Sequence, residues 1–233
     1  MKTWLLLFAL QASLSAFGNS KSCSSLFSWV PFQNSRGLHE YKSLLHPDFP
    51  NSLKRLSSQD FYLDLGSGNG VAAQEFLASF PQTSQAPNVY LVTCELGFFR
   101  RVPTFQGRLK WKVGRLWEEI PDHELPVFQL VTDVFGVISY TRDLSLTLQK
   151  VFLHLEVGGE LYLHSYNPAI QIEVGGNVIG LTQFLRSLSG LKVEGQFGIL
   201  KITKQSAVIS IPQLKLISYE ASSKPPMIRY RLR

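Results

Sequence analysis

The segment DLGSGNG at residues 64–70 places an acidic residue before three alternating glycines. Glycine lets a backbone turn sharply and approach a ligand closely, because it has no Cβ and adopts positive φ easily. A helix that starts after such a turn offers unpaired N–H groups and the positive end of its dipole to a bound group. The sequence therefore predicts a ligand-binding turn made by Asp64, Gly66, Ser67, Gly68, Asn69 and Gly70.

Three familiar motifs fit this segment poorly. A dinucleotide-binding G-x-G-x-x-G turn would need a small residue where Val71 stands. A P-loop would need a Gly-Lys-Ser/Thr run, which the segment lacks. A nucleophile elbow would need a glycine two residues before Ser67, where Leu65 stands. The pattern that fits is D-x-G-x-G-x-G.

The chain around the turn alternates between strand-like and helix-like patterns. Short apolar runs predict strands over 61–65, 89–94, 109–113, 127–132 and 161–164. Apolar residues at helical spacing predict helices over 71–80, 144–155 and 181–188, and one or two short helices over 38–56 interrupted by Pro47 and Pro50. We expect Gly158 and Gly159 to end the helix at 144–155.

This alternation predicts an α/β fold, a three-layer αβα, doubly wound (Rossmann-like) and mostly parallel sheet. Ligands bind such sheets outside the carboxyl ends of the strands, where the glycine turn is expected. From residue 191 onward the strand-like runs 193–203, 207–211, 214–219 and 227–232 follow one another without helices. We therefore expect an antiparallel C-terminal hairpin. No linker divides the chain, so we expect a lead-in with helices over 19–60 and one domain over 61–233.

Residues 1–18 have the layout of a secretory signal peptide, with Lys2, a short apolar run, and small residues before Asn19. The apolar run is shorter than the roughly 20 residues that cross a bilayer, so no transmembrane span is predicted. The sequence predicts export, either secreted or periplasmic. Two alternatives stay open: an amphipathic first helix packed on the domain, and a cytoplasmic protein.

Composition excludes several classes of protein. With 45% hydrophobic and 17% charged residues among 233, the chain is not a disordered one. The net charge of +6 permits an anionic partner, but no basic stripe with interleaved aromatic residues points to nucleic acid. Two cysteines are too few for a disulfide framework. The histidines lack metal-ligand spacing, so no metal site is predicted.

In their order, these motifs resemble the class I S-adenosylmethionine-dependent methyltransferase family over about residues 61–167. FYLDLGSGNG is similar to the family's first motif, and LVTCELG places Glu95 at the end of the second strand. VTDVFG places Asp133 at the fourth strand, and LQKVFLHLEVGGELYLH is similar to the family's helix, Gly-Gly turn and fifth strand.

The resemblance implies S-adenosyl-L-methionine as cofactor. Asp64 would help to hold its amino-acid end, directly or through water, above the backbone of residues 66–70. Glu95 would accept hydrogen bonds from both ribose hydroxyls, which two carboxylate oxygens can do. Two other interpretations stay open: Asp64 caps the following helix, and Glu95 is a solvated strand end.

One position departs from the family's pattern. The family often has an acidic residue after the third strand, facing the adenine amino group, where this chain has Arg115. Arginine cannot accept a hydrogen bond, whereas Leu116 and Trp117 could offer the purine an apolar wall. Asp133 would either face the cofactor or orient the turn after it.

Because the cofactor's methyl group is already activated, catalysis of methyl transfer can be largely positioning. A general base helps only where the accepting atom must lose a proton, and the candidates at strand ends are Tyr140, His164 and Tyr166. A histidine in such a place is more often structural. The resemblance implies methyl transfer to an unidentified small-molecule or protein acceptor. The alternative is an exported, non-catalytic protein that keeps the fold to bind a ligand or partner.

Overall fold

The computed structural model describes residues 36–93, 107–166, 169–220 and 227–233. The signal-like segment 1–18 and Glu95 lie outside the described residues. No helix in the described ranges is long and apolar enough to cross a membrane.

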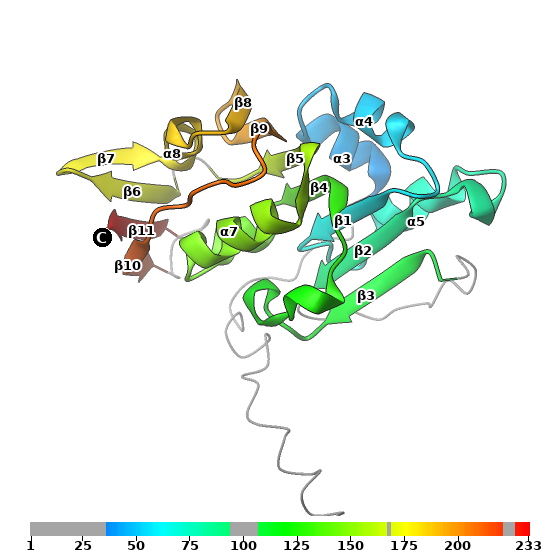
Figure 1. The fold of residues 1–233 in the computed structure, drawn as a ribbon, viewed down its shortest axis with the longest axis horizontal. Helices are drawn as coiled ribbons and strands as arrows, with labels where there is room; N and C mark the ends of the chain where they lie inside the picture. The colour runs from blue at the N-terminus through cyan, green and yellow to red at the C-terminus, as the bar shows by residue number, and fades with distance from the viewer. Residues whose placement is uncertain (1–35, 94–106, 167–168, 221–226) are drawn as a thin grey trace, which may run out of the picture.

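The centre of the molecule is a seven-stranded sheet of order β3-β2-β1-β4-β5-β9-β8 (Figure 1). Its strands are β1 Phe61–Leu65, β2 Asn88–Thr93, β3 Leu109–Val113, β4 Phe128–Val134, β5 Leu155–His164, β8 Leu191–Gln196 and β9 Ile199–Lys204. The strands from β3 to β5 are parallel to one another, whereas β9 pairs antiparallel with β5 and β8. The order reverses between β1 and β4, which is where doubly wound sheets bind ligands.

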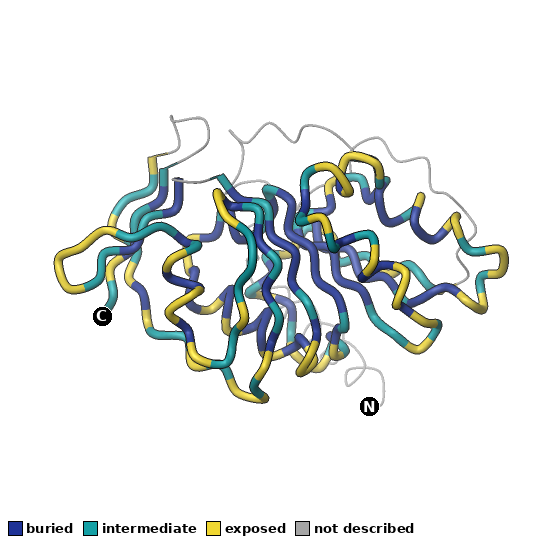
Figure 2. The backbone as a smooth tube through the Cα atoms, turned by 90° about the horizontal axis from the view of Figure 1, so that it is seen from above, coloured by how far each residue is buried: buried dark blue, intermediate teal, exposed yellow. Residues whose placement is uncertain are grey.

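Helices cover both faces of this sheet. One face packs against α3 Leu38–Leu44, α4 Phe49–Arg55 and α5 Val71–Ala78, and the other against α6 Val137–Tyr140, α7 Leu144–His154 and α8 Leu181–Ser187. In the described part of the chain, three short 3₁₀ helices lie in the connections: η1 Thr83–Gln85, η2 Trp117–Glu119 and η3 Asp122–Glu124. Figure 2 shows the central strands as the most continuously buried part of the chain. The predicted three-layer αβα fold with an antiparallel hairpin is confirmed.

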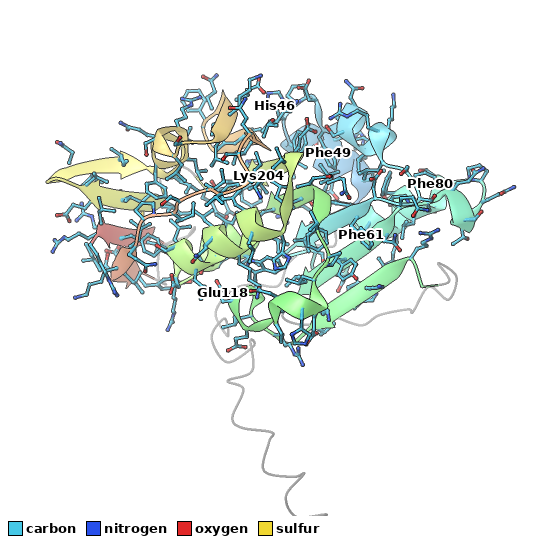
Figure 3. All side chains as sticks on the ribbon, viewed as in Figure 1. His46, Phe49, Phe61, Phe80, Glu118 and Lys204 are labelled. Carbon is cyan, nitrogen blue, oxygen red and sulfur yellow. The ribbon has the colours of Figure 1, made fainter. Side chains whose placement is uncertain are left out.

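Pro47 and Pro50 have different effects on the helices of the lead-in. Pro47 lies between α3 and α4, whereas Pro50 occupies the first turn of α4, where a proline costs no hydrogen bond. Phe49, labelled in Figure 3, packs its ring at 5.3 Å from that of Tyr162 on β5. This contact holds α4 against the sheet.

A second, four-stranded sheet was not predicted. Its order is β10-β11-β6-β7, formed by β6 Ile170–Val174, β7 Asn177–Gly180, β10 Leu214–Glu220 and β11 Met227–Leu232. It lies at the end of the molecule away from β2 and β3 (Figure 1). Its buried residues Ile172, Ile228 and Tyr230 belong to the same hydrophobic cluster as α7 and the central sheet. The strands at 214–219 and 227–232 were expected in the main sheet. They instead pair with each other, and β11 joins them to β6, the strand after β5 in the chain.

Three local predictions were wrong. The run 193–203 is a hairpin, since the chain turns at Phe197 and Gly198, both with positive φ. The run 207–211 pairs with no strand of the described chain. Helix α7 ends at His154 and β5 starts at the next residue, so the two glycines lie inside the strand. Lys204, labelled in Figure 3, donates to the carbonyls of Phe152 and Leu155 and so satisfies the end of the helix.

Candidate functional site

The glycine turn joins β1 to α5 at the carboxyl end of the sheet, and its three glycines have different neighbours. All have positive φ, at 73° for Gly66, 52° for Gly68 and 64° for Gly70. A Cβ on Gly66 would lie 2.4 Å from the Cα of Gly136, and one on Gly70 would lie 2.6 Å from the ring of Trp111. A Cβ on Gly68 would meet nothing within 4 Å. Close packing of the protein therefore requires the first and last glycines, while Gly68 borders open space.

Backbone hydrogen bonds hold the turn in place. The amides of Gly66 and Ser67 both donate to the carbonyl of Val92 at the end of β2, at 2.9 and 3.1 Å. The Gln74 side chain donates to the carbonyl of Asn69 at 3.2 Å. Helix α5 receives no capping hydrogen bond from the side chain at its N-cap, Gly70. The turn is thus fixed by its own neighbours, and the amides at the start of α5 point toward it without a capping side chain.

Asp64 is fully buried at the end of β1. Its carboxyl accepts hydrogen bonds from Thr132 on β4 at 2.8 Å and from the hydroxyl of Tyr41 on α3 at 3.1 Å to each oxygen. Burial raises the pKa of Asp64 to about 7, and the two hydroxyl donors act in the opposite direction. Asp64 therefore ties α3 to the sheet and does not cap α5.

Asp133 is equally buried at the end of the neighbouring strand β4. Its two oxygens accept hydrogen bonds from the amides of Gly136 and Ile138, at 2.9 and 2.8 Å, so it orients the turn after the strand. Burial raises its pKa to about 7 as well. Phe135, within this turn, has a φ of 51°, which is uncommon and strained for a bulky residue.

Phe135 is the centre of a group of rings at the ends of β4 and β5. Its ring stacks on Tyr166 with centroids 4.3 Å apart and lies 4.2 Å from the ring of His164. The guanidinium of Arg36 lies 5.2 Å from the centroid of the same ring. Nδ1 of His164 is buried and has no hydrogen-bond partner among the described residues. The structure thus brings two candidate bases, His164 and Tyr166, together.

Tyr140, the third candidate base, lies half-buried at the end of α6. Burial raises the pKa of its phenol, and Tyr166 and Tyr219 raise it further, while Arg36 lowers it. Tyr140 therefore lies within electrostatic range of Arg36 and Tyr166, two members of the ring group.

The residues after β3 lie differently from what the resemblance implies. Arg115 is half-exposed and forms an ion pair with Glu124 at 3.1 Å. Leu116 is half-buried at the start of η2. Trp117 is 1% exposed and its indole donates to the carbonyl of Thr147 at 3.3 Å. The expectation that Trp117 offers an apolar wall to a ligand was wrong, since its ring belongs to the core.

Sequence reasoning missed Arg36, Tyr41 and Thr132, and it singled out VTDVFG for Asp133 but not for Phe135. Arg36 and Tyr41 stand in the lead-in, which carries no motif, so only their contacts reveal them. Within the described ranges, no group of three or more His, Cys, Asp or Glu side chains is arranged to hold a metal ion.

No family model and no curated protein matches this sequence. Among solved structures, the chain is similar to one in the complex between the Haloferax volcanii Trm112 methyltransferase activator and a candidate methyltransferase, at 19% identity, 54% of each chain and a TM-score of 0.38. It thus spans about half of that chain.

Two further likenesses cover more of the chain. An rRNA methylase from Streptococcus thermophilus is 14% identical over 75% of this chain and 99% of its own, with a TM-score of 0.42. The Burkholderia thailandensis 1,6-didemethyltoxoflavin-N1-methyltransferase is 14% identical over 85% of this chain and 87% of its own, with a TM-score of 0.47. Because these likenesses are distant, we infer function from the strand order and the geometry of the site.

Proposed function

We propose that the chain binds S-adenosyl-L-methionine at the carboxyl ends of β1 and β4 and transfers its methyl group to an unidentified small-molecule or protein acceptor. The observation that carries the proposal is the pair of buried carboxyls, Asp64 and Asp133, beside the glycine turn. Burial raises the pKa of both to about 7. The ion pairs of the described residues all involve other carboxylates.

Two buried carboxyls that have no paired cation among the described residues favour a cationic ligand, because a nearby positive charge stabilises their ionised forms. S-adenosyl-L-methionine brings a sulfonium and an α-ammonium, whereas a dinucleotide would bring further negative charge. Arg36 is the basic group whose charge reaches Asp64, and it acts there only as the weakest of the described influences. The charge of the site therefore fits this cofactor.

The turn fits the other parts of the cofactor. Gly68 leaves open space at its tip, so a ligand can approach the backbone there. The uncapped amides of α5 and the guanidinium of Arg36 suit the carboxylate of its amino-acid end. Glu95 remains the residue predicted to bind the ribose hydroxyls, outside the described part of the chain.

When bound, the cofactor would supply a methyl group already activated by its positive sulfur. The residues of the chain would then position the cofactor and the acceptor, and would not need to activate the methyl group. Asp64 and Asp133 would hold the cationic portion by charge, and the turn would fix its direction. The rings of Phe135 and Tyr166 would exclude water from the path between the methyl group and the acceptor.

Calorimetric titration with S-adenosyl-L-methionine and S-adenosylhomocysteine tests the proposal. Gly68→Asp should abolish binding, because its carboxylate fills the tip of the turn and repels the cofactor's own. Aspartate tolerates a left-handed conformation, so this variant should still fold. Gly158→Asp is the matched control. Gly158 also has positive φ and open space around it, but it lies near the amino end of β5, away from the sheet edge that carries the glycine turn. Equal binding by wild type and Gly68→Asp would contradict the proposal.

A non-catalytic binding role is the second candidate, and one observation favours it. Asp64 is fully buried and accepts three hydrogen bonds from Tyr41 and Thr132, so it serves the protein's own structure. The signal-like residues 1–18 agree with it, because an exported transferase would be separated from a cytoplasmic cofactor. Sequencing the N-terminus of the natural protein separates the two: a start at Asn19 in an exported fraction favours the binding role, and an intact Met1 in the cytoplasm favours the transferase.

A further inference from the structure

We propose that Phe197 binds the methyl acceptor and that the acceptor carries a flat, conjugated ring. This role rests on the proposed function and extends it to the class of molecule that receives the methyl group. Phe197 lies in the turn between β8 and β9, in a part of the chain where the sequence predicted an unbroken strand.

The β8–β9 turn carries a residue that its backbone disfavours. Gln196 pairs with Ile199, so the loop between them has two residues, Phe197 and Gly198, with φ of 52° and 82°. Two-residue loops with positive φ at both positions favour Asn-Gly or Asp-Gly, because a bulky side chain is strained at the first position. Phe197 therefore costs the fold stability that an asparagine at this position would keep.

The turn lies at the same edge of the sheet as the glycine turn. Val134 on β4, His164 on β5 and Ile199 on β9 form one row at the carboxyl ends of β4 and β5. Neighbouring strands lie about 4.8 Å apart, so about 10 Å separates β4 from β9 at this row. Phe135 lies just beyond the row after β4, and Phe197 lies just beyond it before β9. The two phenylalanines therefore flank the end of β5, at the edge where we propose that the cofactor binds.

These two phenylalanines are the non-glycine residues of the described chain with positive φ, and they differ in what contacts their rings. The ring of Phe135 stacks on Tyr166, lies beside His164 and faces the guanidinium of Arg36. Phe197 is 74% exposed, and no aromatic ring or cation of the described residues packs against it. The contacts of Phe135 offset its strain, whereas a ligand that covers the ring of Phe197 would supply the missing compensation.

The surroundings of Phe197 suit a small ring and not a large partner surface. The polar residues that precede it on β8 are Lys192, Glu194 and Gln196, and the first two form an ion pair at 3.0 Å. The other large hydrophobic side chains that are exposed in the described chain lie outside β8 and β9. A stable protein interface buries about 800 Å² on each partner, which one ring on a polar hairpin does not offer.

A flat, conjugated ring is the ligand that gains most from such a side chain. Aromatic rings attract one another in offset or edge-to-face geometry, in addition to the gain from the water that their contact displaces. A cation could also bind the face of a ring, but Arg36 and the positive sulfur of the cofactor would repel it at this edge of the sheet. An uncharged aromatic molecule therefore fits Phe197 best.

Fluorine NMR of the full chain, labelled with 4-fluorophenylalanine and saturated with S-adenosylhomocysteine, tests the proposal. The probes are 2-naphthol, which is flat, and decahydro-2-naphthol, which has the same skeleton without conjugation. We expect 2-naphthol to shift the signal of Phe197, which its loss in Phe197→Asn assigns, and the saturated probe to leave it unchanged. The affinity for 2-naphthol should fall about tenfold in Phe197→Asn, and Phe197→Tyr, which keeps the ring, should retain it.

The same substitution separates a binding role from a structural one. Asparagine adopts positive φ readily, so Phe197→Asn should raise the folding equilibrium constant about fivefold in urea unfolding. Val208→Asn is the control, because Val208 is 79% exposed, follows the opposite end of β9 and has no positive φ. The control should change this constant and the affinity for 2-naphthol by less than about twofold. A Phe197→Asn variant that unfolds more readily than wild type would overturn the proposal, because Phe197 would then serve the fold.

The outcomes separate the two proposals. A shift caused by 2-naphthol alone, with Phe197→Asn more stable and weaker in binding, supports the flat-ring acceptor. A Phe197 signal that responds to neither naphthol, or equally to both, overturns it and leaves the proposed function standing. A signal that instead shifts with protein concentration assigns the ring to a contact between two copies of the chain, which also overturns it. If S-adenosylhomocysteine fails to bind wild type, the proposed function falls, and the acceptor role of Phe197 falls with it.

Discussion

Two carboxyl groups on the same face of the central sheet each hold one helix of the lead-in. Asp64 on β1 accepts the hydroxyl of Tyr41 and so holds α3, and Glu160 on β5 accepts the hydroxyl of Ser52 and the guanidinium of Arg55 and so holds α4. Both also accept a hydrogen bond from a hydroxyl on the sheet, Thr132 in the first case and Tyr162 in the second. The two anchors are thus built on one plan.

They differ in charge. Glu160 has Arg55 at 2.7 Å and Lys201 at 3.2 Å, and Lys201 also lies 2.8 Å from Asp48. Asp64 receives its hydrogen bonds within the described chain from hydroxyl donors, and burial raises its pKa to about 7. The anchor of α4 thus pairs its carboxylate with cations, whereas the anchor of α3 has hydroxyl donors. The unpaired anchor lies beside the glycine turn, which is why we assign it to a cationic ligand.

The largest effect is expected from removing the cation of the paired anchor. Lys201→Met should lower the free energy of unfolding by about 3 kcal/mol, because it leaves the carboxylate of Glu160, whose side chain is 12% exposed, with one partner fewer. The pKa of Asp48, which Lys201 lowers by hydrogen bonding, should rise in the variant. Urea unfolding followed by circular dichroism measures the first effect.

Lys192→Met is the control for that variant. Lys192 lies on the adjacent strand β8 and pairs with Glu194 at 3.0 Å, but both side chains are exposed. Its loss should cost less than about 0.5 kcal/mol, as is typical of surface pairs. Similar losses in the free energy of unfolding would mean that the Glu160 anchor contributes no more than a surface ion pair. Glu160 could then no longer be contrasted with Asp64 as a cation-stabilised anchor.

A smaller effect, with a characteristic pH dependence, is expected at the unpaired anchor. The folded pKa of Asp64 is about 7, above its usual 3.8, so the folded chain holds this proton to higher pH than the unfolded chain does. Stability therefore falls as pH rises from about 4 to about 7. Asp64→Asn, which resembles the protonated form, should gain about 2 kcal/mol relative to wild type between pH 5 and pH 8.

Urea unfolding at the two pH values measures that gain. The charge of Asp133 raises the pKa of Asp64, so the two groups titrate as a coupled pair, and the same comparison in an Asp133→Asn background isolates Asp64. If Asp64 holds the positive sulfur, wild type should bind S-adenosyl-L-methionine more tightly than S-adenosylhomocysteine. Asp64→Asn should bind the two equally, because the sulfonium loses its carboxylate partner. An effect of the substitution that is the same at pH 5 and pH 8 would contradict the prediction, because it would show that Asp64 is ionised at both pH values, as a paired carboxylate is.

Local sequence patterns predicted the parallel core of the fold because its elements are determined locally. The strand, turn and helix over 61–78 follow from apolar alternation, three glycines and helical spacing. The second sheet depends on pairing across the chain, since β11 pairs in parallel with β6, and nothing local distinguishes this partner from β9. The extended run 207–211 shows the same limit, as a strand-like pattern that pairs with no strand of the described chain.

The site divides in the same way. The glycine turn and the acidic residues at strand ends were predictable, because their spacing relative to the strands carries the signal. Tyr41 and Arg36 were not, because they reach the site from a separate segment, and Tyr41 precedes Asp64 by 23 positions in the chain. Trp117 was assigned to a ligand because it comes after a strand, although the same large apolar ring can equally well fill the core.

The smallest effect is expected at Arg115, the cationic partner of a third carboxylate. The carboxylate of Glu124 accepts hydrogen bonds from Lys112 and Arg115. Both lower its pKa, as expected for a paired surface group, and the hydrogen bond of Lys112 has the larger effect. Since Arg115 is half-exposed, Arg115→Ala should lower the free energy of unfolding by less than about 0.5 kcal/mol and change the affinity for S-adenosylhomocysteine by less than about twofold. Calorimetric titration and urea unfolding of the variant measure both quantities. A tenfold loss of affinity would instead place Arg115 against the bound nucleoside. A carboxylate paired with cations would then also lie at the ligand site, and the distinction between paired structural carboxylates and the unpaired Asp64 would fail.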